Sequence, residues 1–293
     1  MTSSTDLAAL LCSRLCHDML SPVGALSNGL ELLRDERDPE MRQRCMELLE
    51  QSARISADKL KFFRLAYGAA GGFGETVPVE EPRGLVQALL GDKGRIELAW
   101  VVSDDMLPKA AVKVLLNLAA IGIDALPRGG NLDIGAERRE GATEIAVRAA
   151  GAKIAFDPAI GEALDGSLPA DELSGRTAPA HMIRLLAEEQ GGGLQYALAE
   201  GALVMGAVQP DDFALFGDQI VRADLGCRVA QAFDGLIGRA EVRVVEHDHR
   251  DRLAALVPVG REHFAVDKLI LHRTSDLLSL PPLSIRRPAG PRP

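Results

Sequence analysis

The chain has 293 residues, of which 47% are apolar, so it is long enough for one large or two ordinary domains with true cores. Its net charge of −9 argues against a nucleic-acid backbone as the main partner, and an aromatic fraction of 4% leaves little to stack on bases. No apolar run reaches the roughly 18 residues of a membrane span, and no signal peptide begins the chain, so we expect a cytoplasmic protein without a membrane partner.

The first 68 residues predict two long amphipathic helices. Leucines and methionines recur at three- and four-residue steps from about Thr5 to Arg34, and a second such pattern runs from Pro39 to Tyr67. The short charged turn between them makes the pair an antiparallel hairpin. Two helices cannot bury a complete core, so we predict that the hairpin, residues 1–68, pairs with a second copy in a four-helix bundle and that the protein is a homodimer.

Residues 69–76 are rich in glycine and predict a linker, and residues 77–216 then alternate between helix and strand patterns. The predicted helices are 85–90, 108–126 and 180–190, and the predicted strands are 95–102, 131–135, 144–149, 194–198 and 203–208. Such an order indicates an α+β fold in which helices cover one face of a mixed sheet. Residues 217–293 predict no fold and are interpreted as a C-terminal extension that is partly ordered or disordered.

The most informative segment lies on the first predicted helix, where His17 is followed by Asp18 and then by Ser21 and Pro22. This pattern resembles the phosphoacceptor box of two-component histidine kinases. A neutral imidazole accepts a phosphoryl group well near neutral pH, since its ordinary pKa is about 6.5. We predict His17 and Asp18 as the catalytic pair, with Asp18 holding the ring or its proton. Pro22 cannot donate to the carbonyl of Asp18, so the helix should bend just past the histidine.

The helical spacing turns His17 about 200° away from Leu15, which lies on the apolar stripe, so the imidazole should face outward. Its neighbours on the outer part of the helix are small or polar, as suits a surface that another protein approaches closely. We predict that the following residues bind the partner: Ser13, Arg14, Ser21, Gly24 and Asn28.

In finer detail, residues 11–33 resemble the alphaproteobacterial histidine phosphotransferases of the ChpT family, and the resemblance extends from about Leu7 to Val208. It implies a histidine-kinase-like dimerisation hairpin followed by a degenerate ATPase-like α/β sandwich that helps to bind the incoming receiver domain. It also implies a relay through His17, from the receiver of a CckA-like hybrid kinase to CtrA-like and CpdR-like response regulators. The first helix has no second carboxylate cluster, so the Mg²⁺ that such transfer needs should come with the partner receiver.

The sandwich keeps the frame of a histidine kinase ATP site while losing its chemistry. Asn117 stands where kinases have their first asparagine, but the second, which would hold Mg²⁺, is Ile121, and a basic position is Asp124. The adenine-binding aspartate motif falls on residues 149–153 as AAGAK, and the glycine-rich phosphate loop falls on residues 177–181 as TAPAH. We therefore expect no ATP, cofactor or metal bound by this chain, and we interpret Asn117 as an ordinary helix residue.

Two alternatives stay open at this point. The chain could be an active histidine autokinase that binds ATP through unfamiliar residues, or a non-catalytic adaptor that binds receivers without accepting phosphate. Outside the histidine motif, the four cysteines match no zinc spacing and are expected to be reduced, buried thiols. His247 and His249 form no strong metal-binding pattern either.

Overall fold

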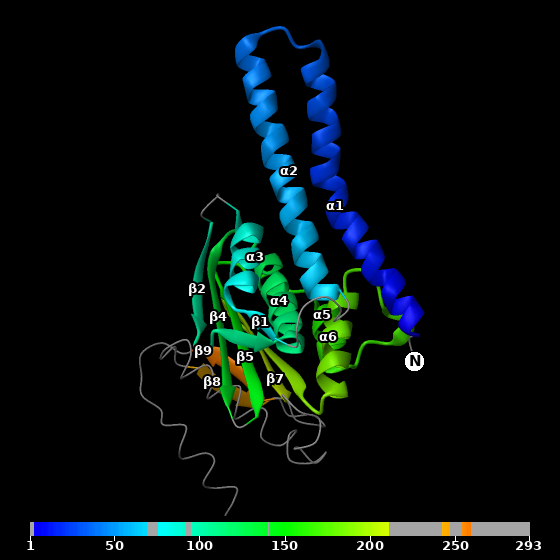
Figure 1. Ribbon diagram of the computed structural model, residues 1–293. Helices are drawn as coiled ribbons and strands as arrows, with labels where there is room; N and C mark the ends of the chain where they lie inside the picture. Colours follow the sequence, from blue (N-terminus) through cyan, green and yellow to red (C-terminus); the bar gives the residue numbers. More distant parts are fainter. Residues whose placement is uncertain are drawn as a thin grey trace, which may run out of the picture. The chain divides into compact units, whose positions relative to one another are not determined.

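The computed structural model describes residues 3–68, 76–91, 95–139 and 141–210, together with two strands at 242–246 and 254–258. Most of the predicted linker, 69–76, and most of the predicted C-terminal extension, 217–293, lie outside these residues. The described chain consists of a long helical hairpin and a sheet covered by helices (Figure 1). Among its helices, none is both long enough and apolar enough to cross a membrane.

The hairpin is formed by α1 (Ser4–Asp35) and α2 (Pro39–Tyr67), which agree with the predicted helices within one residue at each end. Ser3 and Asp6 close a capping box at the start of α1, and the Asp38 side chain accepts a hydrogen bond from the Glu40 amide at the start of α2. Arg42 of α2 closes the turn, since its Nη1 donates to main-chain carbonyls at the end of α1, 3.2 Å from that of Leu33 and 2.9 Å from that of Glu36.

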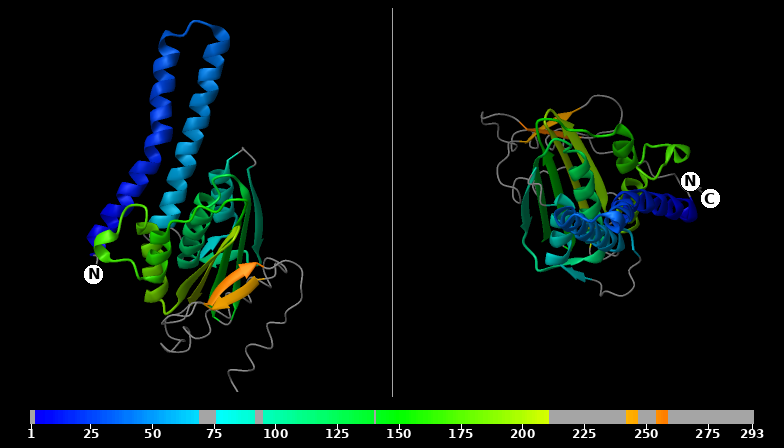
Figure 2. Two further views of the ribbon diagram at one scale, coloured as in Figure 1. Left: turned by 180° about the vertical axis from the view of Figure 1, so that it is seen from behind. Right: turned by 90° about the horizontal axis from the view of Figure 1, so that it is seen from above.

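The first helix is bent, as its internal proline predicts. Pro22 lies inside α1 with its ring buried, and the N-terminal half of α1 diverges from α2 while the two helices run side by side near the turn (Figures 1 and 2). Gly29 allows a close approach farther along, because a Cβ there would lie 2.9 Å from Leu49 Cδ2. The bend carries the N-terminal part of α1 towards α6, which it contacts.

The sheet contains five strands in the order β2 (Ile96–Val102), β4 (Gly130–Arg139), β5 (Ala142–Ala150), β7 (Ala202–Pro210) and β6 (Gly193–Ala199). Only β2 and β4 run parallel, and the other neighbours are antiparallel. The helices of this region are α3 (Glu80–Leu90), α4 (Lys109–Asp124), α5 (Pro158–Asp165) and α6 (Ala178–Glu189). Alternate residues of β4, such as Leu132 and Ile134, are fully buried in the core beneath α4. The predicted α+β class is confirmed.

Several elements differ from their predictions. The strands β1 (Thr76–Pro78) and β3 (Met106–Pro108), and α5, were not predicted, because three-residue strands and an eight-residue helix are too short for a recognisable period. Pro108 was expected in the first turn of a helix, but it is the last residue of β3, and α4 begins at the next residue. The strands β8 (Val242–Glu246) and β9 (Ala254–Pro258) pair with each other.

Cys45 is buried as expected, but Cys12 and Cys16 are exposed, which corrects that expectation for the two thiols on the outer part of α1.

The hairpin and the sandwich share one hydrophobic core. The C-terminal turns of α2 bury Phe62, Phe63 and Leu65 in the same cluster as Leu115 and Leu116 of α4. Aromatic contacts stiffen this end of α2, since the Phe63 ring stacks on that of Tyr67 with centroids 5.3 Å apart. The base of the hairpin is thereby held against the helical layer of the sandwich.

This shared core predicts how much stability is lost when a buried side chain of α4 is truncated. Leu115→Ala removes a fully buried side chain and should lower the free energy of unfolding by about 2–5 kcal/mol, measured by urea denaturation followed by far-ultraviolet circular dichroism. Leu198→Ala, at a side chain that is 51% exposed on β6, is the matched control and should cost less than about 1 kcal/mol. Equal costs at the two positions would contradict the placement of α4 in the core.

Candidate functional site: an exposed histidine on the first helix

The predicted outward orientation of His17 is confirmed. Its side chain is 82% exposed, while Leu15 and Met19 on either side of it pack against the core. The alternation follows from the helical period, which sends positions two residues apart to different sides of the helix. The imidazole is thus accessible to a large molecule, on a helix whose other side is fixed by packing.

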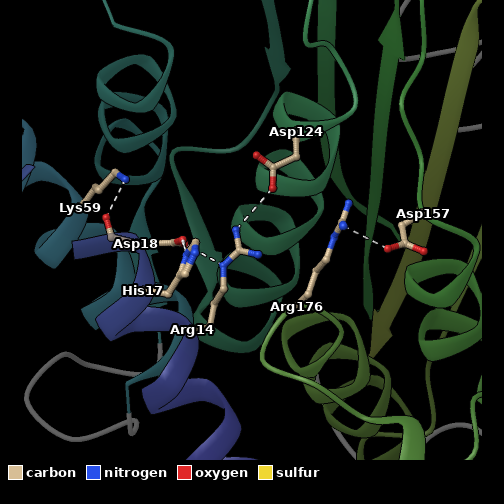
Figure 3. Close-up of polar contacts among 7 residues, drawn as sticks. All are labelled: Arg14, His17, Asp18, Lys59, Asp124, Asp157 and Arg176. Carbon is tan, nitrogen blue, oxygen red and sulfur yellow. Dashed lines mark hydrogen bonds and ion pairs between the residues drawn. The ribbon is translucent and has the colours of Figure 1, made fainter. Parts of the chain in front are cut away.

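The carboxylate of Asp18 holds two neighbours. Its Oδ1 lies 3.1 Å from His17 Nδ1, and its Oδ2 accepts a 2.7 Å hydrogen bond from Arg14 Nε (Figure 3). A carboxylate only accepts, so this contact favours the tautomer of the neutral imidazole with the proton on Nδ1 and the lone pair on Nε2. The arrangement orients the ring and leaves its outer nitrogen as a nucleophile.

The main chain of Asp18 is held by Lys59, which the sequence interpretation did not include. Lys59 Nζ donates to the Asp18 carbonyl oxygen at 2.9 Å, across from α2 to α1 (Figure 3). The spacing in the sequence could have indicated this contact, because Asp18 lies 20 residues before Asp38 and Lys59 lies 21 residues after it. An antiparallel hairpin with its turn at this point brings the two positions level.

Arg14 joins the helix to the sandwich. Its Nη2 lies 3.4 Å from Asp124 Oδ2 at the end of α4, so the arginine connects two carboxylates (Figure 3). The segment before α6 packs close by, since a Cβ at Gly175 would lie 3.4 Å from the Leu10 carbonyl oxygen. The next residue, Arg176, pairs with Asp157 at 3.3 Å. A series of alternating charges therefore leads from the histidine to the loop before α6.

Tyr67, the last residue of α2, lies within the field of these charges. Burial raises the pKa of its phenol to about 12, and the nearby positive charge of Arg14 opposes this rise. The hydroxyl thus remains protonated beside Arg14 at every physiological pH.

The predicted partner-binding residues divide into two groups. Ser13, Ser21 and Asn28 are exposed, and a Cβ at Gly24 would meet no atom within 4 Å, so the small size of these residues serves no packing inside this chain. Arg14, in contrast, is occupied by its two ion pairs.

The positions that the sequence pattern aligns with a kinase ATP site have structural surroundings. Asn117 is buried, and its Nδ2 donates to the Lys113 carbonyl at 2.8 Å, so it behaves as a satisfied helix residue. Ile121 lies in the hydrophobic core, and Pro179 lies in the first turn of α6, where the kinase pattern has a flexible loop. Within the described residues, no group of three or more histidine, cysteine or acidic side chains could hold a metal ion. His247 and His249 lie outside those residues.

Known proteins share these features. The family model of the histidine phosphotransferase C-terminal domain matches residues 79–202. Protein phosphotransferase ChpT of Brucella abortus (strain 2308) is 36% identical over 189 residues, which are 64% of this chain and 88% of that protein. A solved structure of a bacterial phosphotransferase is 32% identical with a TM-score of 0.62, over 71% of this chain and 98% of its own.

A helical hairpin with an exposed histidine, joined to an α/β sandwich that matches the histidine phosphotransferase domain, defines a protein phosphotransferase. With 36% identity over most of the Brucella protein, the chain belongs to the ChpT family of histidine phosphotransferases.

The environment of Tyr67 predicts an alkaline titration. The chain has two tyrosines, and burial raises the pKa of both, that of Tyr67 to about 12 and that of Tyr196 above its ordinary value. An unfolded tyrosine titrates near about 10, so the stability that the neutral Tyr67 phenol contributes is complete below that pH and is lost as the pH rises towards about 12.

Ultraviolet absorbance of phenolate measures this directly. In the Tyr196→Phe variant, the remaining tyrosine should show no ionisation near about 10 while the protein stays folded by circular dichroism. Ionisation of Tyr67 at the ordinary tyrosine pKa in the folded protein would show that this side chain is solvated, and would contradict the packing described at the base of α2.

Proposed function

We propose that this phosphotransferase carries the phosphoryl group on His17, receiving it from an aspartyl phosphate on a hybrid kinase receiver and passing it to aspartates of response regulators. The observation that carries the proposal is the Nδ1–Oδ1 contact of 3.1 Å between an 82% exposed imidazole and Asp18. It leaves the unprotonated Nε2 on the exposed side of the ring, where a second protein can reach it.

Transfer of the phosphoryl group from the receiver aspartate to His17 needs no proton transfer. The Nε2 lone pair attacks phosphorus, the bond from phosphorus to the receiver carboxylate oxygen breaks, and the receiver aspartate leaves as a carboxylate. The imidazole, now bonded to phosphorus at Nε2 and to hydrogen at Nδ1, carries positive charge that the Asp18 carboxylate stabilises at 3.1 Å. The same sequence in reverse delivers the group to the next receiver.

The transferred group brings about two negative charges, and phosphoryl transfer depends mainly on positioning and on neutralising such charge. The exposed Arg176 supplies positive charge from this chain, whereas Arg14 is occupied by Asp18 and Asp124. We propose that the Mg²⁺ comes with the partner receiver.

We propose that the receiver docks on the outer face of α1, where small or polar residues leave room for a close approach: Ser13, Ser21, Gly24 and Asn28. The family membership supports a CckA-like kinase as the donor and CtrA-like and CpdR-like regulators as acceptors. We propose that these regulators control the cell cycle or motility and that the relay works in the cytoplasm.

We further propose that the chain does not bind ATP. Ile121 and Pro179 support this, because one is buried in the core and the other stiffens the start of α6. Asp124 adds a negative charge where kinases have a basic residue, and it is paired with Arg14.

The exposed apolar side chains of the hairpin support a dimer. Val23 and Leu30 on α1 are seven residues apart, as are Met41, Leu48 and Ile55 on α2, and all five are exposed in one copy. Seven-residue spacing places side chains in line along a helix, which is the pattern of helix-bundle packing. We propose that a second copy covers this stripe and completes a four-helix bundle.

Charges on the stripe should separate the dimer. Leu48→Glu with Ile55→Glu should reduce the mass measured by light scattering after gel filtration to that of one chain, 31.3 kDa. Ala53→Glu with Ala57→Glu adds the same charge to exposed sites of α2, with Ala57 about 180° round the helix from Leu48, and should leave the dimer intact. A wild-type mass of one chain would rule out the dimer.

The relay is tested in two reactions, each with the wild type and with His17→Gln. The first contains the protein with radiolabelled ATP and Mg²⁺, and the second contains it with a hybrid-kinase receiver domain charged by radiolabelled acetyl phosphate. We expect acid-labile label only in the second reaction and only when His17 is present, because the imidazole is the sole proposed acceptor.

The other outcomes identify the alternatives. Label from ATP alone would mean an active autokinase, and receiver binding by both proteins without any label would mean an adaptor. Label retained by His17→Gln would place the acceptor on another residue.

A further inference from the structure

One main-chain carbonyl in α1 has lost its helical partner. In an α-helix the carbonyl of residue 18 accepts from the amide of residue 22, but Pro22 has no N–H. The carbonyl oxygen of Asp18 is therefore without its usual donor, inside a helix and beside a buried proline ring. An unsatisfied carbonyl of this kind is costly unless another donor reaches it.

Lys59 supplies that donor from the other helix. Its Nζ lies 2.9 Å from the Asp18 carbonyl oxygen, in a part-buried position, and the ammonium makes the hydrogen bond a charge-assisted one. The residue whose main chain it holds is the residue whose side chain orients His17 at 3.1 Å and binds Arg14 at 2.7 Å. Lys59 is therefore one residue removed from the reacting imidazole.

We infer that Lys59 is a positioning residue for transfer through His17: it holds the carbonyl that Pro22 leaves free, and so fixes the turn from which Asp18 sets the imidazole. The inference rests on the proposed role of His17. Pro22 and Lys59 then act as a unit, in which the proline opens the helix past the histidine and the lysine keeps the opened turn rigid. A lysine that served only to join the two helices would have no dependence on Pro22.

Lys61 provides the matched control. It lies on the same helix, two residues on, but its side chain is 61% exposed and pairs with Asp58 of its own helix at 3.2 Å. Lys61→Met removes the same charge from α2 without touching the Asp18 carbonyl.

The experiment is a double-mutant cycle with Pro22→Ala, which restores the amide that Asp18 lacks. Transfer from a receiver domain charged by acetyl phosphate is followed over a range of receiver concentrations. Lys59→Met should lower the maximal rate roughly tenfold or more, as misplacement of a reacting group does, with the half-saturating concentration unchanged. In the Pro22→Ala background the same change should cost less than about twofold, since the restored amide replaces the lysine. Lys61→Met should match its parent protein in both backgrounds, the wild type in one and Pro22→Ala in the other.

A second readout does not need transfer. Long-range proton–nitrogen NMR of the His17 ring should show the proton on Nδ1 in the wild type and a mixture of Nδ1 and Nε2 tautomers in Lys59→Met. If the wild type takes no label but Lys59→Met shifts the tautomer, the proposed function fails and the positioning role stands. Equal rate losses in both Pro22 backgrounds, or a Lys59→Met protein with normal rate and tautomer, would overturn the inference.

Discussion

The arrangement around His17 depends on Asp18, which is held by both its side chain and its main chain. Its two carboxylate oxygens are taken by His17 and Arg14, and its carbonyl is taken by Lys59. Each contact uses a different atom, so none competes with another. A residue fixed in this way can orient a neighbouring imidazole that is otherwise free in solvent. The exposure and the order that the proposed transfer needs are thus combined at one side chain.

The geometry around His17 also needs a fixed base for the hairpin, and the sandwich provides this base. The aromatic residues at the end of α2 lie in one core with α4, and that packing brings Asp124 within reach of Arg14. The ion pair of Arg14 with Asp124 is only partly shielded and is weak by itself. Its position matters more than its energy, since it couples the end of α4 to the carboxylate that holds His17. The sandwich is therefore a support for the helix that carries His17.

The residues at the positions that the sequence pattern aligns with a kinase ATP site are integrated into this support. Asn117 uses its amide to satisfy the carbonyl of Lys113, and Ile121 contributes to the core. Where the kinase pattern has a second asparagine this chain has the apolar Ile121, and where that pattern has a basic residue it has Asp124, which pairs with Arg14. These side chains thus serve packing and the attachment of the hairpin to the sandwich, which agrees with the proposed relay between proteins.

The sequence by itself determined the local features of this protein. Helical period and Pro39 placed α1 and α2 within one residue, and the same period placed His17 outward, because these properties depend on neighbours only a few positions away. Short elements such as α5 and β3 were not predicted because they contain too few residues to show a period. Only the tertiary structure decided that Lys59 reaches the Asp18 carbonyl and that Arg14 reaches Asp124. Those contacts join residues 41 and 110 positions apart, and they exist because the packing of α2 on α1 and α4 brings the side chains together, which no local pattern encodes.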